Sequence, residues 1–182
     1  IASGSTLSGA ITVTAGSIKL AETGTLASSV SMSGGTLDAD NSLTVSGALS
    51  QSGNITIDVA DNKTLTYSGT AISLGANTLT LSGGGSLVSG GLTLDNASSK
   101  LVLNSITVDN VSTTSDSLGL DVDNNSTVTS LTVGHTTPVS IASGSTLSGA
   151  ITVTAGSIKL AETGTLASSV SMSGGTLDAD NS

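Results

Sequence analysis

Apolar and hydroxyl-bearing residues alternate in short units along the whole chain. A typical unit has an apolar residue, then Thr or Ser, then a second apolar residue and a small or acidic residue, as in "ITVT" at 11–14, "LTLS" at 79–82 and "ITVD" at 106–109. Alternation with period 2 places successive side chains on opposite faces of an extended strand. The pattern therefore predicts many short strands, each buried on one face. No stretch combines a 3.6-residue apolar period with a cap, so we expect no long helix.

Residues rich in Gly, Asn, Asp and Ser separate these units. The intervening segments include "SGG", "SGN", "ADN", "GAN" and "DNN". Gly supplies the positive φ that tight turns require, and Asn and Asp side chains hydrogen-bond to their own backbone in turns. An all-β chain with many short strands at regular spacing is typical of a sandwich, a barrel or a solenoid.

A long internal repeat favours the solenoid. Residues 141–182 repeat residues 1–42 without a mismatch. Repeats at a fixed distance usually indicate stacked units that bury their apolar faces only against their neighbours. We therefore expect a parallel β-helix (β-solenoid) with about 20 residues per turn and seven turns in each 140-residue repeat.

The expected turns begin at apolar residues within strand units. These residues are Val139, Ile18, Leu37, Ile55, Leu79, Leu101 and Leu118, which gives turn lengths of 19, 19, 18, 24, 22, 17 and 21 residues. Neighbouring turns would pair at a spacing of ~4.8 Å, so one block would span ~34 Å along the axis. The variation from 17 to 24 residues leaves tandem β-sandwich domains open as the alternative fold.

The repeat also predicts the domain organisation. We expect residues 1–140 to form one full repeat block and residues 141–182 to form the start of the next, identical block, within one continuous solenoid. The chain begins without Met and stops inside a repeat, so we expect it to be an excerpt of a longer tandem array.

The composition predicts a thin core. Ser, Thr and Gly account for 86 of the 182 residues, while Tyr67 is the only aromatic residue and Pro138 the only proline. The core must therefore be built from Leu, Ile, Val and Ala. Because 36% of the residues are apolar and only 9% are charged, the composition differs from that of a disordered chain, and we expect the chain to fold.

The charge disfavours two classes of partner. The formal net charge is −9, with four Lys and no Arg, and the chain has no Cys. Nucleic acids and anionic membrane surfaces both require a basic face, so we expect neither as a partner. No apolar run approaches 18 residues, so no membrane insertion is expected in this segment.

Residues 76–105, "ANTLTLSGGGSLVSGGLTLDNASSKLVLNS", carry a family resemblance that extends in composition over the whole chain. They are similar to the Gly-, Ser-, Thr- and Asn-rich coils of bacterial extracellular β-solenoid repeat proteins: autotransporter passengers, filamentous-haemagglutinin-like adhesins and giant repeat adhesins. The resemblance implies an extracellular or cell-surface protein that is fibrous or adhesive. It implies no catalytic residue.

Acidic turns are candidates for a Ca²⁺ site. Closely spaced carboxylates occur in "DAD", "DVAD" and "DVD", and Ca²⁺ takes six to eight oxygen ligands. The pattern lacks the Gly and Glu of an EF-hand loop and the "GGxGxD" of calcium-binding β-rolls. Solvated turns with outward acids are therefore the competing interpretation. The candidate ligands are Asp38, Asp40, Asp58, Asp61, Asp121 and Asp123.

No catalytic constellation stands out in the sequence. His135 is the only histidine and precedes Pro138 in "VGHTTP". A nucleophilic triad needs Ser, His and an acid that converge, and Ser is too frequent here for its presence to carry information. We interpret His135 as a loop residue and expect neither an enzyme nor a cofactor.

These observations favour a structural protein. We expect an extracellular fibre or stalk segment that provides length, rigidity and a polar Ser/Thr/Asn-rich surface, with itself as partner, end to end or laterally. The first alternative is an adhesin passenger that binds host or biofilm glycans or receptors on cell surfaces. The lesser alternative is a solenoid enzyme. Loss of activity on substitution of Asp121 and Asp123 would support it.

Overall fold

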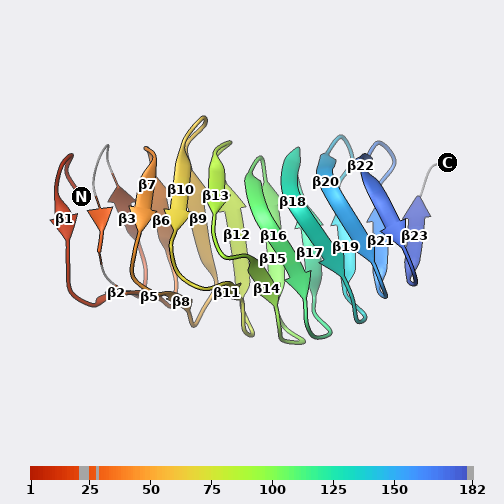
Figure 1. Cartoon of the computed structure of the whole chain (residues 1–182), viewed down its shortest axis with the longest axis horizontal. Helices are drawn as coiled ribbons and strands as arrows, with labels where there is room; N and C mark the ends of the chain where they lie inside the picture. The colour runs from red at the N-terminus through yellow and green to blue at the C-terminus, as the bar shows by residue number, and fades with distance from the viewer. Residues whose placement is uncertain (21–24, 28, 180–182) are drawn as a thin grey trace.

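The chain folds as a stack of parallel coils. The computed structural model describes residues 1–20, 25–27 and 29–179, and within these ranges every regular element is a β-strand. All strand pairs are parallel, and nine coils follow one another from the N-terminal to the C-terminal end (Figure 1). The predicted parallel β-helix is confirmed. The alternative of β-sandwich domains is wrong, because sandwich sheets are built from antiparallel strands.

No helix in the described ranges is long and apolar enough to cross a membrane.

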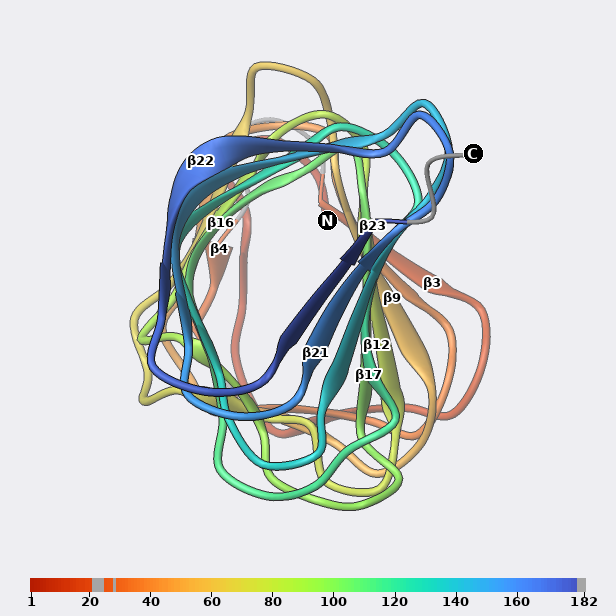
Figure 2. The same cartoon turned by 90° about the vertical axis from the view of Figure 1, so that its right-hand side faces the viewer.

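Each coil runs over up to three faces, which enclose one interior (Figure 2). Face 1 is an 11-stranded sheet of β1 (Thr6–Leu7), β4 (Thr25–Leu26), β7 (Leu43–Val45), β10 (Thr64–Tyr67), β13 (Ser86–Val88), β16 (Thr107–Thr113), β18 (Ser126–Val133), β20 (Thr146–Val153) and β22 (Thr165–Met172), with β11 (Ile72–Ser73) and β14 (Leu92–Leu94) joined at its side. Face 2 contains β2 (Ile11–Val13), β5 (Val30–Met32) and β8 (Leu49–Gln51). Face 3 contains β3 (Ser17–Leu20), β6 (Thr36–Ala39), β9 (Ile55–Val59), β12 (Thr78–Ser82), β15 (Lys100–Asn104), β17 (Gly119–Val122), β19 (Pro138–Ile141), β21 (Ser157–Leu160) and β23 (Thr176–Ala179).

The register along face 3 gives the length of each coil. Paired residues are 19 positions apart between β3 and β6, 20 between β6 and β9, 24 between β9 and β12, and 22 between β12 and β15. They are 19 apart at each of the four later steps. Seven steps lead from β1 to β20, which begins at the copy of Thr6, so the predicted seven turns per 140 residues are confirmed.

Two of the expected steps between turn starts are wrong by two residues. Leu37 pairs with Ile57 and not with Ile55, whereas Ile55 pairs with Leu79 as expected. Leu118 lies outside β17 and is 58% exposed, and Leu120 takes its expected place in the ladder. A shift of two residues keeps the same face of a strand inward, so the hydrophobic pattern alone does not distinguish the two registers.

The interior is a thin aliphatic column. Leu37, Leu79 and Leu101 are fully buried, and along β9 and β12 buried residues alternate with half-buried ones. Because each strand contributes one inward side chain per two residues, Leu, Ile and Val stack in ladders from coil to coil. The interior is therefore the thin, aliphatic core that the composition predicts.

The only aromatic side chain is buried at a point where the backbone passes close to its ring. Tyr67 is 6% exposed, and its hydroxyl accepts a hydrogen bond from the backbone N–H of Leu49 at 3.2 Å. A Cβ at Gly69 would lie 2.1 Å from the Tyr67 Oη. Gly69 therefore provides the space that the ring requires.

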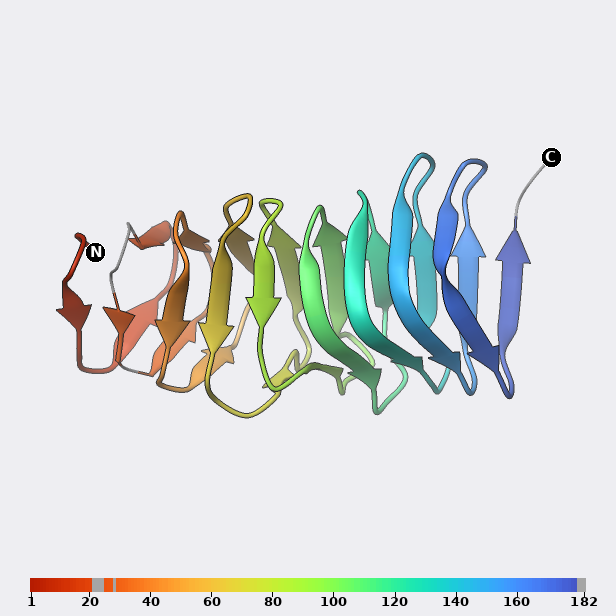
Figure 3. The ribbon, with the colours of Figure 1, turned by 45° about the horizontal axis from the view of Figure 1, so that its top comes forward.

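The cross-section changes along the stack, and the two identical segments differ accordingly. In the first copy β1 and β2 are separate strands of two and three residues, whereas in the second copy the same sequence forms one eight-residue strand, β20. The strand β20 pairs with β18, which is also eight residues long, and the longer strands occupy the C-terminal end of the stack (Figure 3). The conformation of this segment therefore follows that of the neighbouring coil and not its sequence alone.

Candidate functional site

The outer surface of face 3 positions three of the six candidate aspartates in two rows. One row, read coil by coil, is Ser17, Thr36, Thr56, Thr80, Val102, Asp121, Ser140, Lys159 and Asp178. The other is Lys19, Asp38, Asp58, Ser82 and Asn104. The remaining candidates, Asp40, Asp61 and Asp123, lie just beyond the ends of β6, β9 and β17. Paired strands lie ~4.8 Å apart, so side chains of one row contact those of the adjacent coils.

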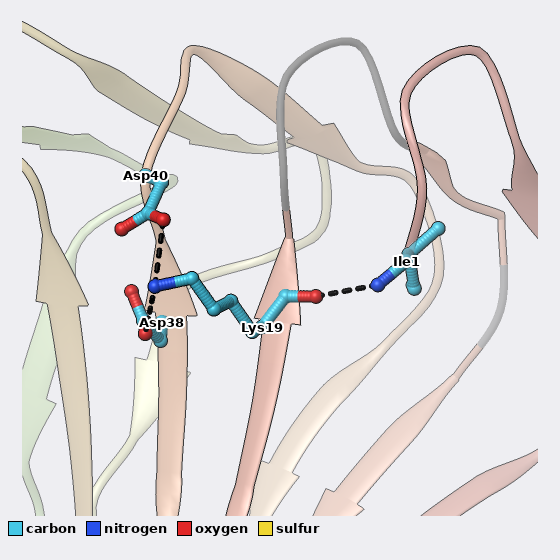
Figure 4. Close-up of polar contacts among 4 residues, drawn as sticks. All are labelled: Ile1, Lys19, Asp38 and Asp40. Carbon is cyan, nitrogen blue, oxygen red and sulfur yellow. Dashed lines mark hydrogen bonds and ion pairs between the residues drawn. The ribbon is translucent and has the colours of Figure 1, made fainter.

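Lys19 holds two of the candidate carboxylates. Its Nζ lies 3.3 Å from Asp38 Oδ2 and 2.7 Å from Asp40 Oδ2 (Figure 4). The hydrogen bonds to Asp40 and then Asp38 raise the pKa of Lys19, and the bond from Lys19 lowers the pKa of Asp40. The Lys19 side chain is 58% exposed, so solvent screens these ion pairs and they contribute little to stability.

Asp58 is paired within the same row. Ser82 Oγ donates a hydrogen bond to Asp58 Oδ1 at 2.5 Å. Asp38 and Asp58 lie directly opposite each other in adjacent coils, an arrangement in which like charges repel. The contacts from Lys19 and Ser82 offset this repulsion at either side. Asp61 lies in the exposed turn after β9.

Asp121 and Asp123 border a groove on the outer surface of face 3. Lys100 Nζ lies 2.6 Å from Asp121 Oδ2. The groove has a volume of about 290 Å³. Its lining consists of Asp121, Asp123, Ser140, Ile141, Ala142, Lys159 and Ala161. The pairing with Lys100 leaves Asp121 partly neutralised, so the groove combines carboxylate, ammonium and hydroxyl groups.

The six candidate aspartates do not converge on one point. In the part of the chain that the structure describes, no three His, Cys, Asp or Glu side chains are arranged so that they could hold a metal ion. Lys19 contacts the pair Asp38 and Asp40, and Lys100 contacts Asp121. Calcium binding therefore stays a prediction from sequence that this geometry does not strengthen.

His135 lies in an exposed turn with a backbone φ of 57°. In the same turn, the N–H of Thr136 donates a hydrogen bond to Asp116 Oδ1 at 3.0 Å. This bond lowers the pKa of the Asp116 carboxyl. The interpretation of His135 as a loop residue is confirmed. Its positive φ lies in the left-handed region of backbone conformation, which differs from that of a β-strand, so the chain turns at this position.

Sequence reasoning missed the lysine and carboxylate pairs between coils. Lys19 contacts Asp38, which lies 19 positions later, and Lys100 contacts Asp121, which lies 21 positions later. Both separations are close to one coil. A search for opposite charges separated by the repeat length would have found them.

Comparison of the chain with protein-family models, with curated proteins and with solved structures found no match.

Proposed function

We propose that this chain is a structural element of an extracellular or cell-surface fibre or stalk, and that its role is to span distance. The observation that carries the proposal is the unbroken stack of nine parallel coils, in which faces 1 and 3 extend through both copies of the 42-residue segment. Each added coil lengthens such a stack by ~4.8 Å, so the nine coils span roughly 43 Å.

The energetics of a solenoid suit this role. Each coil buries its apolar side chains against the coils before and after it, so added coils extend the core without disturbing existing contacts. The backbone hydrogen bonds of the three faces run along the axis from coil to coil. A continuous ladder of this kind protects the backbone from water and proteases over its whole length.

The outer surface and the composition support an extracellular location. Face 3 presents Ser, Thr, Asn and acidic side chains, and the net charge is −9. Such a surface keeps a long particle soluble and does not attract nucleic acid. The compositional resemblance to bacterial surface β-solenoids supports the same location. The proposal includes neither catalysis nor a cofactor.

The groove at Asp121 and Asp123 favours adhesion as a second candidate function. Its carboxylates, the Ser140 hydroxyl and Lys159 offer acceptors and donors of the kind that sugar hydroxyls require. Binding of purified chain to a glycan array, lost in the double variant Asp121→Asn and Asp123→Asn, would support it. Absence of glycan binding at high protein concentration would argue against adhesion, and the structural role would then be the only proposed function.

The main proposal is tested by lengthening the chain. A chain extended by one further 140-residue block should gain ~34 Å in maximum dimension at constant cross-section, because seven coils are added. Small-angle scattering of dilute samples of both chains measures this difference. A particle that grows equally in all directions would contradict the proposal, because a compact protein expands only with about the 0.38 power of its length.

A further inference from the structure

One backbone ladder is interrupted at a single step inside the stack. Coil 3 consists of β7, β8 and β9, and coil 4 of β10, β11 and β12. Face 2 ends at β8, although β11 follows it along the stack and takes the same place within its own coil (Figure 1). The strand β11 pairs only with β14, whereas faces 1 and 3 continue from coil 3 to coil 4. Within the described residues, no other step lacks a ladder of this kind.

A tyrosine hydroxyl takes the place of a backbone acceptor at this step. One coil earlier, the N–H of Val30 donates a hydrogen bond to the Ala48 carbonyl oxygen at 2.7 Å. Leu49 lies opposite Val30 in the ladder, but its N–H donates to Tyr67 Oη at 3.2 Å. Tyr67 belongs to β10, so a side chain of coil 4 makes the contact that a backbone carbonyl makes one coil earlier.

A glutamine side chain makes a second contact across the step. Gln51 lies opposite Met32, which is fully buried, so a polar side chain occupies a position that is apolar one coil earlier. Its Nε2 donates a hydrogen bond to the Leu74 carbonyl oxygen at 2.8 Å. Its Oε1 is buried and accepts no hydrogen bond from the described residues. A buried acceptor without a partner raises the free energy of the closed state, so this contact holds the step closed only weakly.

The chain takes a longer path through coil 4 at this point. Four residues separate β10 from β11, whereas three separate β7 from β8. The four include Gly69, where a Cβ would lie 2.1 Å from Tyr67 Oη. The backbone therefore passes close to the end of the Tyr67 ring before it reaches β11. The hydroxyl, and not the backbone of β11, then meets the Leu49 N–H.

The missing ladder makes this step the weakest of its neighbourhood. A coil of a solenoid is stabilised by its own contacts and by those with its two neighbours. The steps from coil 2 to coil 3 and from coil 4 to coil 5 each have three ladders, whereas the step from coil 3 to coil 4 has two. Local opening occurs where the fewest stabilising contacts are lost. Faces 1 and 3 keep the two coils attached when the third side opens.

From these observations we infer that the step between coils 3 and 4 is a hinge, at which the stack opens locally between β8 and β11 while faces 1 and 3 stay paired. Opening breaks the hydrogen bonds from Leu49 to Tyr67 and from Gln51 to Leu74, and it breaks no backbone ladder. The stack then bends at this step without losing a strand pairing. The inference goes beyond the proposed structural role and does not depend on it, because it concerns one step within a single chain.

Native-state hydrogen exchange of the full chain, followed by mass spectrometry of its peptides, tests the hinge. The protection of β8 is compared with that of β5, one coil earlier, and of β14, two coils later. Amides of β8 should exchange about tenfold faster than those of both other strands, which is the effect of about one net hydrogen bond. The comparison with β5 is decisive, because fraying from the N-terminal end would expose β5 before β8.

An isosteric variant and a matched control sharpen the test. Gln51→Glu replaces the amide that donates to Leu74 by a carboxylate, which repels that carbonyl oxygen. Asn54→Asp adds the same charge nearby and keeps the Oδ1 that accepts a hydrogen bond from the Thr78 N–H at 2.8 Å. Gln51→Glu should speed the exchange of β8 by roughly a further tenfold. It should also increase acrylamide quenching of the fluorescence of Tyr67, the only aromatic residue. Asn54→Asp should change neither quantity.

Three results would overturn the inference. The first is equal protection of β5, β8 and β14 in the unmodified chain, a comparison that stands even if Gln51→Glu fails to fold by circular dichroism. The second is an equal effect of the two variants on β8. The third is loss of protection in β7 and β9 together with β8, because faces 1 and 3 would then open as well. None of these results changes the scattering of a lengthened chain, so failure of the hinge and failure of the structural role are distinguishable.

Discussion

The duplicated segment provides a matched pair of positions at which burial by a neighbouring coil is the main variable. Leu37 and Leu177 have the same sequence on both sides, and both lie in face 3 next to a preceding coil. Leu37 is also covered by Ile57 of the following coil and is fully buried, whereas Leu177 is 45% exposed. Replacing each by Ala measures what the following coil contributes.

The magnitudes follow from the burial. Leu37→Ala removes a fully buried side chain and leaves a cavity, so we expect a loss of about 3 kcal/mol in the free energy of unfolding. Leu177→Ala removes a side chain that contacts only one coil, and no closed cavity results, so we expect about 1 kcal/mol or less. The expected difference is therefore about 2 kcal/mol.

The assay is urea denaturation followed by circular dichroism, at a protein concentration at which sedimentation shows monomers. The midpoints of the two variants and of the unmodified chain give the two losses. Equal losses at the two positions would refute the reasoning, because they would mean that the following coil does not cover Leu37.

Three further predictions concern single contacts. Tyr67→Phe should destabilise the chain by about 1–2 kcal/mol in the same assay, because the buried Leu49 N–H loses its acceptor, and an unchanged midpoint would contradict this contact. Gly149→Ala should destabilise far more than Gly9→Ala, the same change in the other copy: a Cβ at Gly149 would lie 1.8 Å from the Val128 carbonyl oxygen, whereas nothing lies within 4 Å at Gly9, and equal midpoints would refute the difference. The lowered pKa of Asp116 adds stability above its unfolded pKa of about 3.9 that is lost as the pH falls through the lower folded value, so Asp116→Asn should flatten the acid limb of a plot of stability against pH.

Most of the fold could be predicted from the pattern of short strands. Period-2 alternation and the 140-residue repeat sufficed to predict parallel coils, because in a solenoid each inward residue stacks on its equivalent in the next coil. The expected steps from Leu37 to Ile55 and from Leu101 to Leu118 were wrong by two residues, because a shift of two residues keeps the same face of a strand inward and the loops absorb the difference. Loop lengths, and not the strands, decide between such registers.

The change in cross-section along the stack could not be predicted from the sequence. Residues 6–13 and 146–153 are identical, yet they form two short strands in one place and a single strand in the other. Their conformation depends on the coil beside them, which a local pattern does not contain. The candidate calcium residues illustrate the same limit, because Asp38 and Asp121 face lysines that are one coil away in sequence.

Disulfide trapping in this cysteine-free chain can establish whether successive coils stack in parallel and in the observed register. Thr36 and Thr56 lie opposite each other in β6 and β9, so the double variant Thr36→Cys and Thr56→Cys should form an intramolecular disulfide under mild oxidation. The control pair Thr36→Cys and Asn54→Cys is offset by two residues and is separated by roughly 8 Å, beyond the reach of a disulfide. Mass spectrometry of the oxidised monomer should find the bond in the first variant alone. A bond in the control, or in neither variant, would contradict the stacked parallel coils.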